Sequence, residues 1–132
     1  MLSNTLLTAL NKQVSNEFYS SYLYLQMASW FDHNSLLGFG NWMKMQAQEE
    51  AAHTMILFNY ILERGSMVDL GAIPSPTADY DSPLDVLEHT LLHEQNVTAS
   101  INNLMALAIE EKDYATKAHL DWFIREQVEE EA

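Results

Sequence analysis

Hydrophobic side chains recur at steps of three and four residues along four segments of the chain, which is the spacing of one face of an α-helix. The pattern predicts helices over residues 4–32, 36–64 and 84–110, and a fourth from residue 114 to the end. No segment alternates apolar and polar residues over a length that would build a sheet. The sequence therefore predicts an all-α protein with a single domain over residues 1–132.

The connection between the second and third helices differs from the other two, which are short. Residues 66–83 hold all three prolines and cannot continue a helix. Gly65 is expected to end the second helix, and Ser82 with Pro83 to begin the third. A helix of about 28 residues is about 42 Å long, and a linker of about 17 residues spans up to about 55 Å. The linker can therefore run the length of the bundle, which makes helices two and three parallel and predicts a four-helix bundle with a long crossover.

Each predicted helix carries one glutamate on its apolar face: Glu17, Glu50, Glu94 and Glu130. Each glutamate lies fourteen to sixteen residues from its own hairpin turn, which is about 21–24 Å along a helix. Residues at equal distances from the turn of an antiparallel hairpin lie at equal height. The four carboxylates are therefore expected to meet in the middle of the bundle.

Four carboxylates at one buried level need protons or cations, because burying one unpaired charge costs several kcal/mol. Two divalent metal ions would balance the four negative charges, and His53, three residues after Glu50, can add a nitrogen ligand. Oxygen-rich ligation with one imidazole favours iron or manganese, and zinc could occupy such a site without redox activity. The alternative is a helical interaction protein whose glutamates are protonated or in contact with water. The lysines and arginines all fall off the apolar faces: Lys12, Lys44, Arg64, Lys112, Lys117 and Arg125.

The composition narrows the choice of partners. Nineteen acidic and six basic residues give a formal net charge of −13, which repels nucleic acid and anionic membranes and attracts cations. No apolar run approaches the length of a membrane-spanning helix, and the first ten residues lack the features of a signal peptide. The chain has no cysteine, which excludes disulfides and thiolate metal sites and fits a reducing compartment. We therefore expect no nucleic-acid partner and no membrane partner.

Four segments together resemble the bacterial non-haem ferritins: LNKQVSNEFYSSYLYLQMASW, QAQEEAAHTMILFNYILERG, HEQNVTASINNL and EKDYATKAHLDWFIREQVEEE. The resemblance covers essentially the whole chain and implies a ferritin-like four-helix bundle. It implies iron storage and detoxification by a ferroxidase, which oxidises Fe²⁺ with O₂ or peroxide and passes Fe³⁺ to a mineral core. It further implies a homo-oligomeric shell of 24 subunits in the cytoplasm.

The resemblance also implies a ferroxidase centre with two iron sites. Glu17, Glu50 and His53 match the ligands of the first site, and Glu50 matches the ligand that bridges both ions. Glu94 and Glu130 match the ligands of the second site. A third iron site on the inner side, on the path to the mineral, is implied for Glu49, Glu126 and Glu129, which could instead be ordinary solvated acids.

The same resemblance implies roles for three residues beside the centre. Gln127 matches a position that forms a hydrogen bond near the centre, and Tyr24 matches a tyrosine that gives up an electron during oxidation. Trp122 matches a nearby aromatic residue that can take part in the same electron transfer as Tyr24, although packing is the simpler role. Tyr24 could likewise be an ordinary core tyrosine. His93 is expected at the surface or behind the ligands, because it points about 100° away from the neighbouring Glu94.

The departures from related families restrict the cofactors. Bacterioferritins carry a methionine haem ligand just after the bridging glutamate, where this chain has Ala51, so no haem is expected. They also carry a second Glu-x-x-His in the last helix, where this chain has Gln127 and Glu130. Rubrerythrins bind a further iron through cysteines, and this chain has none.

The fourth helix is shorter than the family pattern, which continues about fourteen residues past the mid-bundle glutamate and adds a fifth helix. We therefore expect the chain to be either a fragment or a natural or engineered C-terminal truncation, with fraying near Glu129 and Glu130 and weaker binding at the second site in both cases. The apolar faces at Leu10, Ile61 and Leu84 are expected to be short of a partner. An alternative function follows from this expectation: a di-metal oxidase, or a metal-binding helical bundle, that does not close into a shell.

Overall fold

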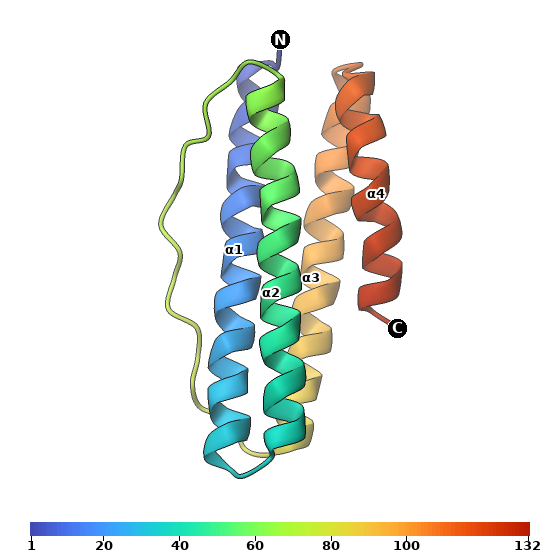
Figure 1. The fold of residues 1–132 in the computed structure, drawn as a ribbon. Helices are drawn as coiled ribbons and strands as arrows, with labels where there is room; N and C mark the ends of the chain where they lie inside the picture. Colours follow the sequence, from blue (N-terminus) through green and yellow to red (C-terminus); the bar gives the residue numbers. More distant parts are fainter.

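The computed structural model describes all 132 residues, which form the helices α1 (Asn4–His33), α2 (Leu37–Glu63), α3 (Pro83–Glu110) and α4 (Tyr114–Glu130). Helices α1 and α2 form one antiparallel hairpin, α3 and α4 form the second, and the hairpins pack into one bundle (Figure 1). The all-α prediction is confirmed, and the predicted boundaries of the first three helices agree within one residue.

Local sequence signals account for the helix ends. The Ser82 hydroxyl accepts a hydrogen bond from the Asp85 backbone amide at 3.0 Å, and Pro83 occupies the first turn of α3, as predicted. Gly65, with φ of +81°, follows the end of α2 in the left-handed conformation that glycine adopts without strain. The two short turns use the same conformation at Ser35 and Lys112.

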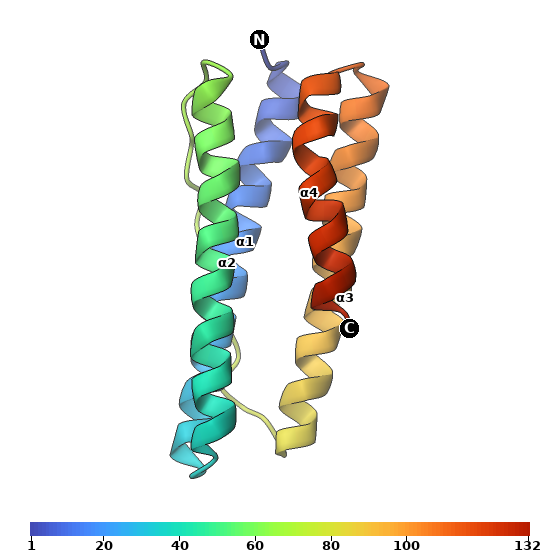
Figure 2. The ribbon, with the colours of Figure 1, turned by 45° about the vertical axis from the view of Figure 1, so that its right-hand side comes forward.

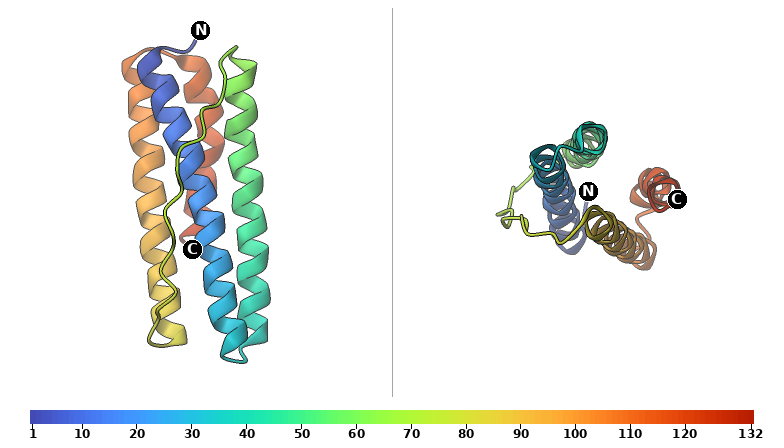
Figure 3. Two further views of the ribbon diagram at one scale, coloured as in Figure 1. Left: turned by 90° about the vertical axis from the view of Figure 1, so that its left-hand side faces the viewer. Right: turned by 90° about the horizontal axis from the view of Figure 1, so that it is seen from below.

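The linker between α2 and α3 runs along the outer side of α1 from one end of the bundle to the other (Figure 3). It is attached to α1 where the Asp69 backbone amide donates to Asn11 Oδ1 at 3.1 Å. Near the end of the linker, Tyr80 is buried and packs edge-on against Trp30. The predicted crossover is confirmed: α2 and α3 are parallel, and the two hairpin turns lie at opposite ends of the bundle.

The interior consists of two apolar clusters separated by a polar layer. The upper cluster, at the end where α4 begins, includes Leu6, Leu10, Leu57, Ile61, Ile101 and Leu120. The lower cluster, at the turn between α1 and α2, includes Met27, Phe31, Met43, Tyr80 and Val86. The buried glutamates lie between these clusters, so apolar side chains pack above and below them.

The prediction of unpartnered apolar residues is correct at one end of the bundle and wrong at the other. Leu10 and Ile61 are fully buried, because α4 begins at their end and packs over them. Helix α4 ends part-way down the bundle, beside α3 (Figure 2). Beyond that point Leu84 is 63% exposed, and an apolar hollow is lined by residues that include Phe39, Trp42 and Leu87.

A polar network joins the two hairpins at the upper end. The Arg64 guanidinium donates to both carboxylate oxygens of Asp113, at 2.8 and 3.0 Å, and holds the pKa of Asp113 down at about 2. The hydroxyls of Tyr60 and Thr116 lie 2.9 Å apart beside this pair. This network ties the end of α2 to the start of α4.

None of the four helices carries an apolar stretch suited to crossing a bilayer.

Candidate metal centre

One glutamate from each helix reaches the polar layer between the two apolar clusters. Glu17, Glu50 and Glu94 are buried, and Glu130 is half-buried. Ligand atoms within 4.8 Å of one another define three groups, and two of them contain these glutamates alone or with His53: Glu17–Glu50–His53 and Glu50–Glu94–Glu130. The sequence prediction that the four carboxylates meet at mid-bundle is therefore confirmed as geometry.

Short contacts between helices hold these carboxylates in register. The Ser21 hydroxyl donates to the Ala47 backbone carbonyl at 2.7 Å, one turn from both Glu17 and Glu50. Such a bond fixes the height of α1 against α2 at the level of the centre. The Gln127 amide does the same between α4 and α3, because it donates to the Glu94 backbone carbonyl at 3.3 Å.

Glu50 occupies the middle of the arrangement and belongs to both groups. Its side chain is 1% exposed, and its Oε1 has no hydrogen-bond partner. The other oxygen, Oε2, lies 3.5 Å from His53 Nδ1. A buried carboxylate oxygen without a donor is costly, and a cation would satisfy it. No lysine or arginine does so, because their ion pairs involve Asp32, Asp113 and Asp121.

Burial and the neighbouring carboxylates raise the pKa of every carboxyl group of the centre when no cation is bound. Burial, and then the neighbouring Glu50, raises the pKa of Glu17 to about 8. Burial, and then Glu94, raises the pKa of Glu50 to about 8 and that of Glu130 to about 7. Burial also raises the pKa of Glu94, and hydrogen bonds to its carboxylate partly oppose this rise.

These raised pKa values predict that the metal-free protein loses stability as the pH rises from about 6.5 to 8, the upper part of the range between the ordinary glutamate pKa of 4.5 and the raised values. A carboxyl group with a raised pKa stabilises the folded state while protonated, and this contribution is lost as the pH passes the folded-state pKa. Burial lowers the pKa of His93 to about 4, so this imidazole does not titrate in the same window. Thermal melting with a chelator should show a falling midpoint, and Glu50→Gln should reduce the fall. A midpoint that is constant over this range in the wild type would contradict the shifts.

Both oxygens of Glu94 accept hydrogen bonds from residues behind the centre. The Tyr24 hydroxyl donates to Glu94 Oε1, and Gln127 Nε2 donates to Glu94 Oε2 at 3.2 Å. Gln127 also donates to the Thr98 hydroxyl at 3.1 Å. Burial, and then Glu94, raises the pKa of the Tyr24 phenol, so this side chain stays protonated. Tyr24 and Gln127 therefore lie beside the centre where the sequence resemblance implied.

The structure places Trp122 and His93 in different surroundings. Trp122 packs edge-on against the His53 ring, with ring centroids 5.1 Å apart. His93 is half-buried rather than on the surface, and its Nε2 lies 2.7 Å from the Ser20 hydroxyl. The His93 ring also meets Tyr24 edge-on at 5.8 Å between centroids. Of the two positions expected for His93, the one behind the ligands is confirmed and the surface is wrong, because the ring packs between α1 and α3.

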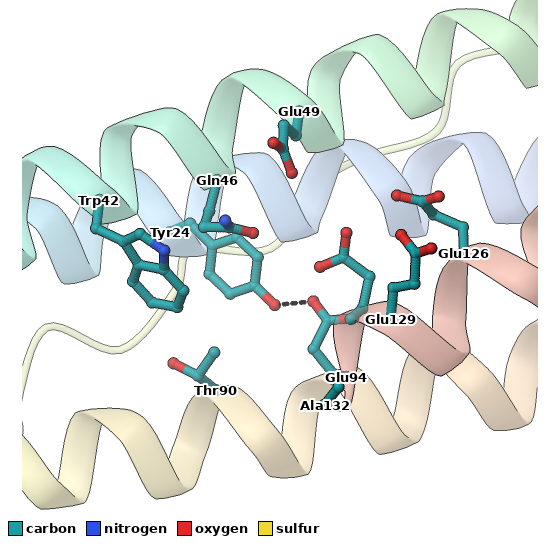
Figure 4. A pocket seen from close by; sticks show the side chains of 10 residues that line it. Tyr24, Trp42, Gln46, Glu49, Thr90, Glu94, Glu126, Glu129 and Ala132 are labelled. Atoms are coloured by element: carbon teal, nitrogen blue, oxygen red, sulfur yellow. Dashed lines mark hydrogen bonds between the residues drawn. The ribbon is translucent and has the colours of Figure 1, made fainter.

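A hollow of about 330 Å³ opens beside the centre and is lined mainly by polar residues (Figure 4). Glu49, Glu126 and Glu129 line it together with Glu94 and Glu130. Of the three acids implied for a third iron site, only Glu126 lies within ligand distance of other candidate ligands, in a group with His53 and Glu130. Glu49 and Glu129 are exposed on the walls of the hollow. The hollow is therefore an opening to the centre that is lined by acidic side chains.

Sequence reasoning missed several residues that shape the centre. Gln13 is buried and donates from Nε2 to Glu17 Oε1 at 3.0 Å. Thr98 accepts from Gln127, and Ser21 fixes the register of α1 against α2. The spacing of Gln13, four residues before Glu17, could have indicated the contact, because residues at i and i+4 share a helix face.

The fold and the site together define a helical bundle with a carboxylate-rich centre that could hold two metal ions and has one imidazole. The model of the Ferritin-like domain matches residues 7–132, and the chain belongs to this family. It is similar to the bacterial non-heme ferritin of Staphylococcus saprophyticus, with 46% identity over 132 residues, covering 100% of this chain and 79% of the relative.

Solved structures of ferritins share the fold. The open-pore ferritin of Archaeoglobus fulgidus superimposes with a TM-score of 0.98 at 49% identity, covering 99% of this chain and 81% of that one. The ferritin of Chlorobium tepidum gives a TM-score of 0.97 at 44% identity, covering 99% and 80%. The family resemblance expected from the sequence is thereby confirmed.

Proposed function

We propose that this protein stores and detoxifies iron by oxidising Fe²⁺ to Fe³⁺ with O₂ or peroxide and passing it to a mineral core. The observation that carries the proposal is the buried, unpartnered oxygen of Glu50 between two groups of candidate ligands. Ferritins are the named relatives at 42–46% identity over the whole chain, which supports iron as the substrate. An oxygen-rich ligand set with one imidazole is suited to this metal.

Each side chain has a defined part in the proposed centre. Glu17 and His53 bind one Fe²⁺, Glu94 and Glu130 bind the other, and Glu50 bridges the pair. Four carboxylates balance the charge of two divalent ions, so binding releases the protons that burial holds on these groups. Each Fe²⁺ then gives one electron to the oxidant, and the two ions held side by side provide a pair of electrons. No haem takes part in this scheme.

The residues around the ligands orient them and provide a path. Gln127 holds the Glu94 carboxylate by its amide. Tyr24, which donates to the other oxygen, would supply a further electron and release its phenol proton when O₂ takes more than the two electrons of the iron pair. Trp122 packs against His53 and fixes its ring. In the proposed scheme Glu126, with the exposed Glu49 and Glu129 turned toward it, would form a third iron site on the acidic wall, through which oxidised iron moves inward.

We further propose that the chain assembles into a homo-oligomeric shell of 24 subunits in the cytoplasm, where a chain without cysteines needs no oxidising compartment. The alternative is an oxidase or metal-binding bundle that does not close into a shell. Particle mass measured together with iron content separates the two: a shell gives a large particle that retains iron.

Anaerobic titration with Fe²⁺ tests the centre directly. About two tight sites per chain are expected, because the ligand groups provide for one ion each and share Glu50. A weaker third site is expected where Glu49, Glu126 and Glu129 act together. Admission of air should then produce absorbance from Fe³⁺ in proportion to the bound Fe²⁺. Saturation below one metal ion per chain would contradict a two-iron centre.

A further inference from the structure

We propose that Gln13 is a positioning residue for the first iron site, where its side-chain amide holds the Glu17 carboxylate in the orientation that binds metal. The proposal rests on the proposed function of the centre and adds a residue that is not itself a ligand. Gln13 is 3% exposed, and its only side-chain hydrogen bond is the one from Nε2 to Glu17 Oε1, at 3.0 Å.

A hydrogen bond to one oxygen restricts the rotation of a carboxylate about its last side-chain torsion, which is otherwise broad. No lysine or arginine forms an ion pair with Glu17, and the neutral amide of Gln13 donates to its Oε1. Residues that hydrogen-bond to a metal ligand orient it and tune its affinity. The amide is neutral, so it fixes Glu17 without neutralising the negative charge that attracts Fe²⁺. A lysine or arginine in its place would compete with the metal ion.

The second iron site is built in the same way, which supports a function for Gln13 rather than chance packing. Gln127 on α4 donates to Glu94 at 3.2 Å, as Gln13 on α1 donates to Glu17 at 3.0 Å. Each site thus has one buried glutamine whose amide donates to one of its carboxylates. The two glutamines lie on different helices and share no hydrogen-bond partner.

Gln13 also forms part of the boundary between the centre and the outer surface. It lines a hollow of about 280 Å³ between α1 and α3, together with Lys12, Asn16, Ser100 and Asn103. A side chain that faces this hollow on one side and Glu17 on the other can be changed with little disturbance of the apolar clusters. The position is therefore suited to a mutational test.

The test is a double-mutant cycle between Gln13→Met and Glu17→Ala, read as the anaerobic Fe²⁺ affinity of each site. Methionine keeps a similar volume and removes the donor. Gln13→Met is expected to weaken the first site about 10-fold and to leave the second site unchanged. In the Glu17→Ala background the same substitution should have no further effect. Gln26→Met, a half-buried glutamine on the same helix, is the matched control and should change neither site.

The outcomes separate this proposal from the proposed function. Equal loss at both sites, or equal loss with and without Glu17, would show a purely structural role and overturn the positioning proposal. Unchanged affinity in Gln13→Met overturns it as well. A wild-type protein that binds no Fe²⁺ overturns the proposed function and this inference together. If Gln13→Met does not fold by circular dichroism, Gln13→Asn is used with the same expectations, because its shorter side chain moves the donor about 1.5 Å further from Glu17 and out of hydrogen-bond range.

Discussion

Replacing Glu50 by alanine is expected to lower the rate of Fe²⁺ oxidation by about 100-fold or more, the largest effect of any single substitution in the centre. Glu50 alone belongs both to the ligand group with Glu17 and to the group with Glu94. Its removal therefore takes a ligand from both ions and the bridge between them. Glu17→Ala and Glu94→Ala each take a ligand from one ion and should cost less. Initial rates of Fe³⁺ formation at two Fe²⁺ per chain measure the difference.

The stability of the metal-free protein should respond to Glu50→Ala in the opposite direction. Burial and the nearby Glu94 raise the pKa of Glu50 to about 8, which means that its ionised form is unfavourable in the metal-free core. Removing it relieves crowding of like charges and deletes an unpartnered oxygen. The variant should melt at the same temperature as the wild type or higher, in the presence of a chelator. Loss of both folding and oxidation would mean that the glutamate is structural.

Binding of a redox-inert divalent ion is expected to raise the melting temperature strongly. At a free Zn²⁺ concentration 1,000 times the dissociation constant, a site that exists only in the folded state stabilises it by about 4 kcal/mol. For a domain of this size such a gain corresponds to roughly 10–20 °C. The physical reason is local: the ion replaces protons on carboxylates from all four helices and ties the hairpin of α1 and α2 to that of α3 and α4.

Differential scanning calorimetry with and without Zn²⁺ measures this shift, and Glu50→Ala is its control. The variant lacks the shared ligand and should retain only a small part of the shift. The chain carries a formal net charge of −13, so weak binding to surface acids would act on both proteins alike. Equal shifts in the wild type and in Glu50→Ala would therefore place the metal on the surface and contradict a site at the centre.

Signals along the chain were enough to predict the helices, their connectivity and the level at which the four glutamates meet. Helix boundaries follow from signals that act within a few residues, such as the Ser82 cap and Gly65. The crossover follows from the length of a proline-containing linker. The common height of Glu17 and Glu50 follows from equal distances to a turn. All of these features depend on chain geometry, which one helix or one hairpin fixes without reference to its neighbours.

The packing of the two hairpins against each other sets which side chains face one another across the bundle. Leu10 was expected to lack a partner and is fully buried, because the two hairpin turns lie at opposite ends and α4 starts beside it. His93 was placed by its angle on one helix, yet the packing of α1 against α3 encloses it. Periodicity tells which face of a helix is buried, but the neighbour that buries it depends on the packing of the hairpins.

The same distinction separates the ligands from the residues that orient them. Glu50 and His53 could be named from their spacing on one helix. The bonds from Tyr24 and Gln127 to Glu94 join helices that are distant in sequence, and they form only when the hairpins are docked. The bond from Gln13 to Glu17 lies within one helix, but its importance arises because the docked hairpins bury it beside the centre. Spacing along the chain thus determines which side chains can reach the centre. Packing determines which of these side chains orient the ligands, because burial strengthens a hydrogen bond or a charge interaction.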